Sequence, residues 1–207
     1  GPNGDLSEPW LARQLSRLLP EGLPLMLASS SPVRDWESFA AADAPQRPLI
    51  GFRGASGIDG TLSLAAGLAL GCGALVLVSG DLALLHDANG WLWRRQLEAR
   101  AARLCVVLVD NGGGGIFEQL PIRLGEEPEP MDFERLFAMP QAIGHCDLAA
   151  GYGVPSRPLT SLDDLSDALA WGLQQPMALL ELRTDRRHDA EARKQLRRRM
   201  APLSVRP

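Results

Sequence analysis

Short, continuous apolar runs along the chain alternate with longer segments in which apolar residues recur every three to four positions. The short runs are typical of strands buried on both faces of a parallel sheet, and the longer segments are typical of amphipathic helices. The predicted strands are residues 23–28, 48–52, 74–79, 104–109 and 177–182. The predicted helices are residues 6–19, 61–71, 82–100 and 161–174, with shorter helical pieces near 133–137 and 147–152. This order predicts the fold class α/β, as a three-layer α/β/α domain with a mostly parallel sheet.

Other segments lack this pattern. Residues 29–32 (SSSP) are predicted to end the first strand, and residues 121–140, which carry Pro, Glu and Gly, are predicted to form a long loop. Residues 184–200 are dense in arginine, which predicts a solvated helix or a frayed end. Gly1 and Pro2 have two interpretations: they could be native, or they could be the remnant that a protease leaves when it removes an expression tag. We therefore divide the chain into residues 1–5 as a linker or tag remnant, residues 6–183 as one folded domain and residues 184–207 as a basic C-terminal tail.

The composition is that of an ordinary folded protein. Of the 207 residues, 45% are apolar and 22% are charged, which excludes wholesale disorder. The 21 basic and 25 acidic residues give a net charge of −4, so general nucleic-acid binding is a poor explanation of the chain. No apolar run reaches the roughly 18 residues that cross a bilayer, and the first residues lack the features of a signal peptide. We expect a cytoplasmic protein with no nucleic-acid partner and no membrane span.

The three cysteines, Cys72, Cys105 and Cys146, are odd in number and widely spaced. We expect reduced thiols, because this spacing fits neither a disulfide framework nor a zinc site. Cys146 follows His145, but no two histidines of the chain stand at the spacing of metal ligands on a helix. We interpret the pair His145–Cys146 as part of a solvated loop.

Polar or glycine-rich residues follow four of the predicted strands. In a parallel sheet, ligands collect outside the carboxyl ends of the strands, so these residues should face one crevice. They are Ser29, Ser30, Ser31 and Arg34 after the first strand, Arg53 with its Gly/Ser loop, Ile58 and Asp59 after the second, Gly80 and Asp81 after the third, and Asp110, Asn111 and four glycines after the fourth. The sequence therefore predicts one crevice that contains carboxylates, an amide, two arginines and exposed backbone.

Asp81 and Asn111 are separated by one strand–helix–strand unit, which brings adjacent strand ends together. A carboxylate, an amide oxygen and a glycine carbonyl are hard oxygen ligands that suit Mg²⁺. The glycines after Asn111 allow the backbone to approach a diphosphate closely. An alternative remains open at this point: Asp81 could be a helix N-cap and the glycines a turn.

Several motifs sharpen this interpretation. They are Gly80-Asp81 followed by Asp110-Asn111, and the runs SSSPVRD (29–35), RGASGIDG (53–60), GDLALLHDANG (80–90), NGGGGIF (111–117) and MDFERLF (131–137). Together they resemble the C-terminal cofactor domain of the 2-succinyl-5-enolpyruvyl-6-hydroxy-3-cyclohexene-1-carboxylate synthases, a family of thiamine-diphosphate-dependent enzymes of menaquinone and phylloquinone biosynthesis. The resemblance extends from about residue 6 to about residue 183, and it favours a metal-binding role for Asp81.

The resemblance implies a site residue by residue. Mg²⁺ or Mn²⁺ would be held by Asp81, Asn111 and the carbonyl of Gly113. Thiamine diphosphate would be held by the same Asp81 and Asn111 and by residues that contact its diphosphate (Gly80, Leu82, Ala83), its aminopyrimidine (Ser56, Gly57) and its bent middle (Ile58). Asp110 stands where the family usually has Asn, and we expect its carboxylate to point away from the diphosphate or to act through water.

The resemblance also implies the substrates, 2-oxoglutarate and isochorismate. The substrate pocket would be shaped by Ser30, Arg34, Arg53, Ile116 and Phe117. Both substrates are dicarboxylates, which arginine binds in a two-pronged geometry. The synthase would decarboxylate 2-oxoglutarate and add the resulting succinyl-semialdehyde carbanion to isochorismate.

Enzymes of this kind need a glutamate that protonates the cofactor's aminopyrimidine, and the family carries it in a separate N-terminal pyrimidine-binding domain of the partner chain. We therefore expect the full enzyme to be a homodimer or homotetramer and the 207-residue chain alone to be inactive. Two alternatives remain. The chain could belong to another thiamine-diphosphate carboligase or 2-oxoacid decarboxylase, or it could be a non-catalytic nucleotide-binding α/β module.

Overall fold

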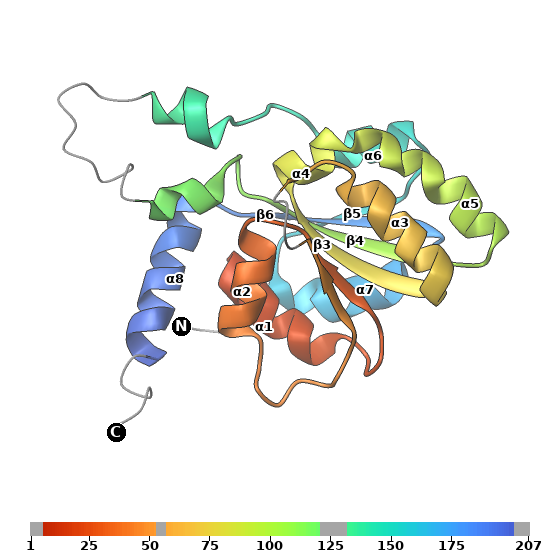
Figure 1. Ribbon diagram of the computed structural model, residues 1–207, viewed down its shortest axis with the longest axis horizontal. Helices are drawn as coiled ribbons and strands as arrows, with labels where there is room; N and C mark the ends of the chain where they lie inside the picture. Colours follow the sequence, from red (N-terminus) through yellow and green to blue (C-terminus); the bar gives the residue numbers. More distant parts are fainter. Residues whose placement is uncertain (1–5, 53–56, 121–131, 201–207) are drawn as a thin grey trace.

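The computed structural model describes residues 6–52, 57–120 and 132–200. A six-stranded sheet crosses the molecule in the order β2-β1-β3-β4-β6-β5, and every neighbouring pair is parallel (Figure 1). Its strands are β1 (Leu25–Leu27), β2 (Leu49–Gly51), β3 (Ala74–Gly80), β4 (Arg103–Asp110), β5 (Ser156–Leu159) and β6 (Met177–Arg183). The predicted α/β fold class is confirmed, with all five predicted strands in place.

Helices cover both faces of this sheet (Figure 1). One face carries α1 (Glu8–Leu18), α2 (Ser31–Phe39) and α7 (Leu165–Gly172), and the other carries α3 (Thr61–Cys72), α4 (Asp81–His86), α5 (Arg94–Ala99) and α6 (His145–Gly151). The side chains of β3 alternate between two hydrophobic clusters: Val76 and Val78 pack toward α1 and α7, and Leu75 and Leu77 pack toward α3. This double burial explains the continuous apolar runs of the central strands.

The predicted helix over residues 82–100 is wrong in its continuity. The segment forms α4, a 3₁₀ turn at Ala88–Trp93 and α5. Gly90 lies so close to α3 that a Cβ there would come within 2.9 Å of the side chain of Leu62. Asp87 ends α4 and accepts a hydrogen bond from the backbone N–H of Ser63 at 2.6 Å, in the first turn of α3. The break therefore lets this segment pack closely against α3.

One α-helix and one strand were not predicted. The helix α2 begins at Ser31, inside the segment that was expected only to end a strand, with Pro32 in its first turn, where proline is tolerated. Its buried Trp36 and Phe39 stand three positions apart, a signal too short to be decisive. The edge strand β5 has the sequence SRPL, in which only Leu159 is buried, so it lacks both an apolar run and an alternating pattern.

The basic tail contains a helix, α8 (Arg186–Met200), which stands beside α1 and α2 at the edge of the molecule (Figure 1). The expectation that it would be solvated is wrong for one of its faces, because Asp189 is 0% exposed and Arg193 is 1% exposed. The expectation of a solvated loop for His145–Cys146 is also wrong. His145 is buried at the start of α6, and the Cys146 thiol donates a hydrogen bond to Glu181 at 2.9 Å.

Some sequence expectations fall outside the described residues, namely those for Arg53, Ser56, residues 1–5 and most of the 121–140 loop. The predicted helix near 133–137 is present as a π-helical turn, η4 (Glu134–Ala138). The described cysteines are all free thiols. Within the described ranges, no helix combines the length and the hydropathy needed to cross a membrane.

Candidate functional site

A cavity of about 400 Å³ opens where β1, β3 and β4 end. The described residues that were assigned to metal, cofactor or substrate all line it: Ser30, Arg34, Gly57, Ile58, Gly80, Asp81, Leu82, Ala83, Asn111, Gly113, Ile116 and Phe117. Asp59, which was also expected to face the crevice, does not line it. The rule that ligands collect at the carboxyl ends of parallel strands therefore located the cavity correctly.

Asp81 connects two strand ends across the cavity floor. It follows β3, is 7% exposed, and accepts hydrogen bonds from the backbone N–H of Leu82 at 2.8 Å and of Gly113 at 2.7 Å. Burial raises the pKa of Asp81 to about 6, and the charge of Asp110 adds to the rise, while the two backbone donors oppose it. Asp81 is the first residue of α4, whose N-cap is Gly80, so the N-cap alternative is wrong; the Asp81 side chain instead holds the loop after β4 through Gly113.

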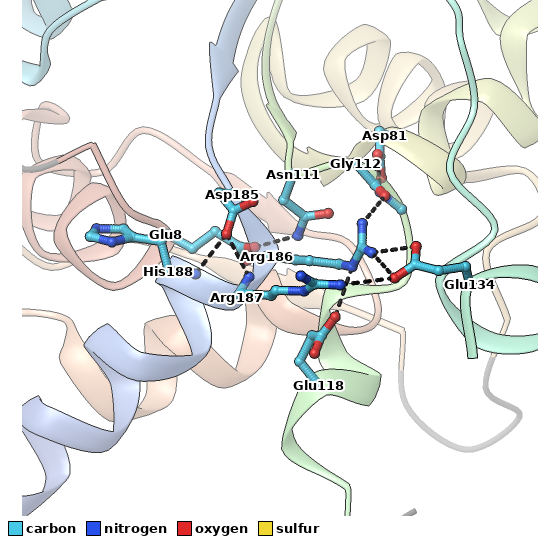
Figure 2. A network of polar contacts seen from close by, with 11 residues as sticks. Glu8, Asp81, Asn111, Gly112, Glu118, Glu134, Asp185, Arg186, Arg187 and His188 are labelled. Carbon is cyan, nitrogen blue, oxygen red and sulfur yellow. Dashed lines mark hydrogen bonds and ion pairs between the residues drawn. The ribbon is translucent and has the colours of Figure 1, made fainter. Parts of the chain in front are cut away.

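Asn111 lies beside Asp81 on the loop that follows β4 (Figure 2). Its Nδ2 donates a hydrogen bond to Oε1 of Glu8 at 2.5 Å, and its Oδ1 is buried without a hydrogen-bond partner among the described residues. A buried amide oxygen left in this state costs about 1–3 kcal/mol. A bound cation would remove that cost.

The glycines after Asn111 serve the packing of the loop. Gly113 has φ +117, and a Cβ there would lie 2.0 Å from the carbonyl oxygen of Ala138 in η4. Gly114 is as tightly placed, since its Cβ would lie 2.2 Å from the carbonyl oxygen of Phe137. The Gly113 carbonyl accepts a hydrogen bond from the N–H of Gly115 at 2.8 Å. Gly80 differs from these glycines, because no atom of the described residues stands within 4 Å of its Cβ position and the cavity is open there.

Asp110 does not line the cavity. One of its carboxylate oxygens accepts a hydrogen bond from the N–H of Gly112 at 3.3 Å, and the other lies 3.8 Å from Nε of Arg183. Its charge raises the pKa of Asp81, and a side-chain hydrogen bond between Asp110 and Asp81 adds to this rise.

The outer wall of the cavity carries the residues assigned to the substrate. Ser30 has a positive φ of 83, which is uncommon for a residue with a side chain. Its carbonyl accepts a hydrogen bond from Nη1 of the exposed Arg34 at 2.6 Å. Ile116 and Phe117 come from the 3₁₀ turn η2 (Gly115–Gln119), and Phe117 packs edge-on against Phe137. The wall therefore combines one guanidinium with apolar surface.

Sequence reasoning missed Glu8 and Arg186. Glu8 begins α1, lines the cavity and is 4% exposed, and burial raises its pKa to about 8 against the lowering effect of Arg193. Arg186, in the first turn of α8, donates hydrogen bonds to the Gly112 carbonyl at 2.9 Å and to Glu118 at 2.8 Å (Figure 2). An acidic residue in the first turn of a helix and an arginine in a basic tail have ordinary explanations, so neither gave a signal.

Comparison with known proteins identifies the same family as the sequence motifs. The 2-succinyl-5-enolpyruvyl-6-hydroxy-3-cyclohexene-1-carboxylate synthase of Synechococcus sp. strain RCC307 is 57% identical over 196 residues, which cover 94% of this chain and 33% of that protein. The synthase of the same name from Prochlorococcus marinus strain MIT 9313 is 53% identical over 195 residues, 94% of this chain and 32% of that protein. The resemblance to this synthase family is confirmed. The chain spans about a third of the length of these synthases, and no family model matches it.

Solved structures show the same fold at low sequence identity. Benzoylformate decarboxylase from Polynucleobacter necessarius superposes with a TM-score of 0.70 at 18% identity, over 86% of this chain and 33% of that one. The thiamine diphosphate-dependent 4-hydroxybenzoylformate decarboxylase of Rhodococcus jostii RHA1 superposes with a TM-score of 0.60 at 17% identity, over 89% and 33%. The chain therefore has the fold of a domain of thiamine-diphosphate enzymes.

Proposed function

We propose that this chain is the cofactor- and metal-binding part of a thiamine-diphosphate-dependent synthase. The complete enzyme would decarboxylate 2-oxoglutarate and join the remaining four-carbon unit to isochorismate, as a transferase of menaquinone or phylloquinone biosynthesis. The observation that carries the proposal is the buried Oδ1 of Asn111 in the cavity floor, which has no hydrogen-bond partner among the described residues. The extensive identity to named synthases supports the choice of reaction.

The residues present fit a divalent cation and the cofactor. Asp81, Asn111 and the Gly113 carbonyl would hold Mg²⁺ or Mn²⁺, since these are hard oxygen donors and the Asn111 oxygen has no other partner in the described part of the chain. The open wall at Gly80, together with Leu82 and Ala83, would receive the diphosphate. Thiamine diphosphate, when bound, supplies the electron sink for decarboxylation and carbon–carbon bond formation.

The other cavity residues would orient the reactants. Ile58 would support the bent cofactor, with Gly57 and Ser56 against its aminopyrimidine. Arg34 would bind a substrate carboxylate, with Arg53 as a second cation. Ile116 and Phe117 are partly buried apolar residues in the wall, and they would exclude water from the reacting atoms. The guanidinium of Arg34 favours 2-oxoacids that carry a second carboxylate over those whose remaining part is apolar.

We further propose that the parts of the synthases to which this chain does not correspond complete the site. An N-terminal pyrimidine-binding domain, contributed by the partner chain of a homodimer or homotetramer, would supply the activating glutamate. On this proposal the enzyme acts in the cytoplasm, and the 207-residue chain is inactive by itself.

Calorimetry on the full-length protein that contains this chain tests the proposal. Thiamine diphosphate with Mg²⁺ should bind with clear heat, ATP with Mg²⁺ should not, and the loaded protein should consume 2-oxoglutarate only when isochorismate is converted with it. Preferential binding of ATP would instead support a nucleotide-binding module. Binding of thiamine diphosphate without conversion of isochorismate would point to another enzyme of the same cofactor class.

A further inference from the structure

A buried network of charged side chains connects three helices to Asn111. It contains Asp35 of α2, Arg193 of α8 and Glu8 of α1, which are 2%, 1% and 4% exposed. These residues are far apart in the sequence, so only the fold brings them together. Glu8 also lines the cavity, which places one end of this network at the candidate site.

Each contact in the network is a short hydrogen bond or ion pair between named atoms. Arg193 donates from Nε and Nη2 to the two carboxylate oxygens of Asp35, at 2.7 and 2.6 Å. Its Nη2 also lies 2.8 Å from Oε2 of Glu8, and Oε1 of Glu8 accepts the hydrogen bond from Nδ2 of Asn111 at 2.5 Å. The backbone N–H of Glu8 donates to Asp189 of α8 at 2.9 Å, which fixes the start of α1. Both carboxylate oxygens of Glu8 are thus occupied by nitrogen donors.

This arrangement determines which way the Asn111 amide faces. In the structure the NH₂ group of Asn111 is the end that faces Glu8, because its Nδ2 donates to Oε1 while Oε2 is paired with the guanidinium of Arg193. The Oδ1 atom is therefore directed to the other side, toward Asp81, as Figure 2 shows.

We propose that Glu8 and Arg193 are positioning residues that fix the side-chain amide of Asn111, so that its Oδ1 is presented to a divalent cation held together with Asp81. The proposal rests on the proposed function and adds to it a role for two helices outside the strand ends. Neither residue contacts the cation; Arg193 holds Glu8, and Glu8 holds Asn111.

Stability alone is a poor explanation of this cluster. Removing charges from water is costly, and replacing a buried ion pair by apolar residues of similar volume is often neutral or stabilising. Here the carboxylates of Glu8, Asp35 and Asp189 surround one buried guanidinium. An apolar contact between α1, α2 and α8 would join the helices at least as well, but it could not orient an amide.

Titration of Mn²⁺ into the full-length protein saturated with thiamine diphosphate tests the proposal, with free Mn²⁺ measured by electron paramagnetic resonance. Glu8→Gln keeps the shape of the side chain. Its amide oxygen should pair with Arg193, so its NH₂ group should face Asn111 and turn Oδ1 of Asn111 away from the cation. We expect Mn²⁺ affinity to fall at least tenfold. Arg193→Met should act similarly, and Arg193→Lys, which keeps a cation beside Glu8, should recover part of the loss.

A stability control and a double substitution separate positioning from general damage. Leu165→Ala removes a fully buried side chain of α7 and should lower the melting temperature without changing Mn²⁺ affinity. If Glu8 acts through Asn111, Glu8→Gln should have no further effect on Mn²⁺ affinity in an Asn111→Ala background. Unchanged affinity in the Glu8→Gln protein, or full additivity with Asn111→Ala, would overturn the proposal. Should Glu8→Gln fail to fold, the contrast between Arg193→Lys and Arg193→Met decides the matter by the same criterion. Failure of the unsubstituted protein to bind Mn²⁺ with thiamine diphosphate would refute the proposed function itself.

Discussion

Gly113→Ala should be strongly destabilising, because the loop after β4 has no room for a methyl group there. The added Cβ would lie 2.0 Å from the Ala138 carbonyl oxygen and 2.9 Å from its carbonyl carbon, and φ at this position is +117. The backbone strain costs about 1–3 kcal/mol. Relief of the clash would separate the loop from η4 and weaken two hydrogen bonds, from Gly114 N–H to Ala138 and from Gly113 N–H to Asp81. At about 1 kcal/mol for each bond, the total is roughly 3–5 kcal/mol.

Urea unfolding of the 207-residue chain measures this loss, and Gly67→Ala is the matched control. Gly67 is exposed in the middle of α3, and nothing stands within 4 Å of its Cβ position, so the same substitution should stabilise the chain by about 0.5–1 kcal/mol. The two substitutions should therefore change the free energy of unfolding in opposite directions. A loss below 1 kcal/mol in Gly113→Ala would show that the loop tolerates a side chain and that its close packing on η4 is not required.

Further predictions concern the site and the buried charges. Asp81→Ala should weaken Mg²⁺-dependent binding of thiamine diphosphate to the full-length protein more than tenfold in calorimetry. Asp110 lies outside the cavity, so Asp110→Ala should change this affinity little. The reverse order of the two effects would refute the assignment of Asp81 as the metal ligand. Arg34→Ala should reduce turnover of 2-oxoglutarate about tenfold or more with cofactor affinity nearly intact, and loss of cofactor binding would contradict the assigned role. Burial lowers the pKa of His145, so between that pKa and the ordinary value near 6.5 the unfolded chain binds more protons than the folded chain, and the free energy of unfolding falls as the pH falls. His145→Gln should flatten this pH dependence in urea unfolding between pH 7 and 5. An unchanged slope would show that His145 does not cause the dependence.

The central strands and the cavity could be predicted because their signals are local. β3 and β4 are buried on both faces and so appear as uninterrupted apolar runs, and a parallel sheet directs their polar carboxyl ends to one edge. The break between α4 and α5 could not be predicted, because it depends on the close approach of Gly90 to Leu62. That distance is a property of the packed structure and leaves no mark on hydrophobic periodicity.

The buried face of α8 escaped prediction for a different reason. Hydrophobic patterns find helices that bury apolar side chains, but α8 buries Asp189 and Arg193, with Asp35 of α2 opposite. Charged residues are almost never fully buried unless they are paired, and the partner of Arg193 lies far away in the sequence. A sequence pattern that treats arginine as a surface residue therefore assigns this helix to solvent.

The SSSPVRD motif (29–35) contains residues that line the cavity and one residue that belongs to the buried charged network. Its Arg34 is exposed at the cavity wall, with its guanidinium on the Ser30 carbonyl, while the next residue, Asp35, is buried and holds Arg193. Because α2 turns by about 100° per residue, neighbouring side chains face different directions. One short motif can therefore contribute both to the cavity and to the buried charged network. Through Arg193 and Glu8, Asp35 is connected to Asn111, so a motif placed at one strand end also bears on the proposed metal ligand at another. Substitution of Asp35 should therefore affect the cation through Asn111, and substitution of Arg34 should affect the substrate, although the two residues are adjacent in the chain.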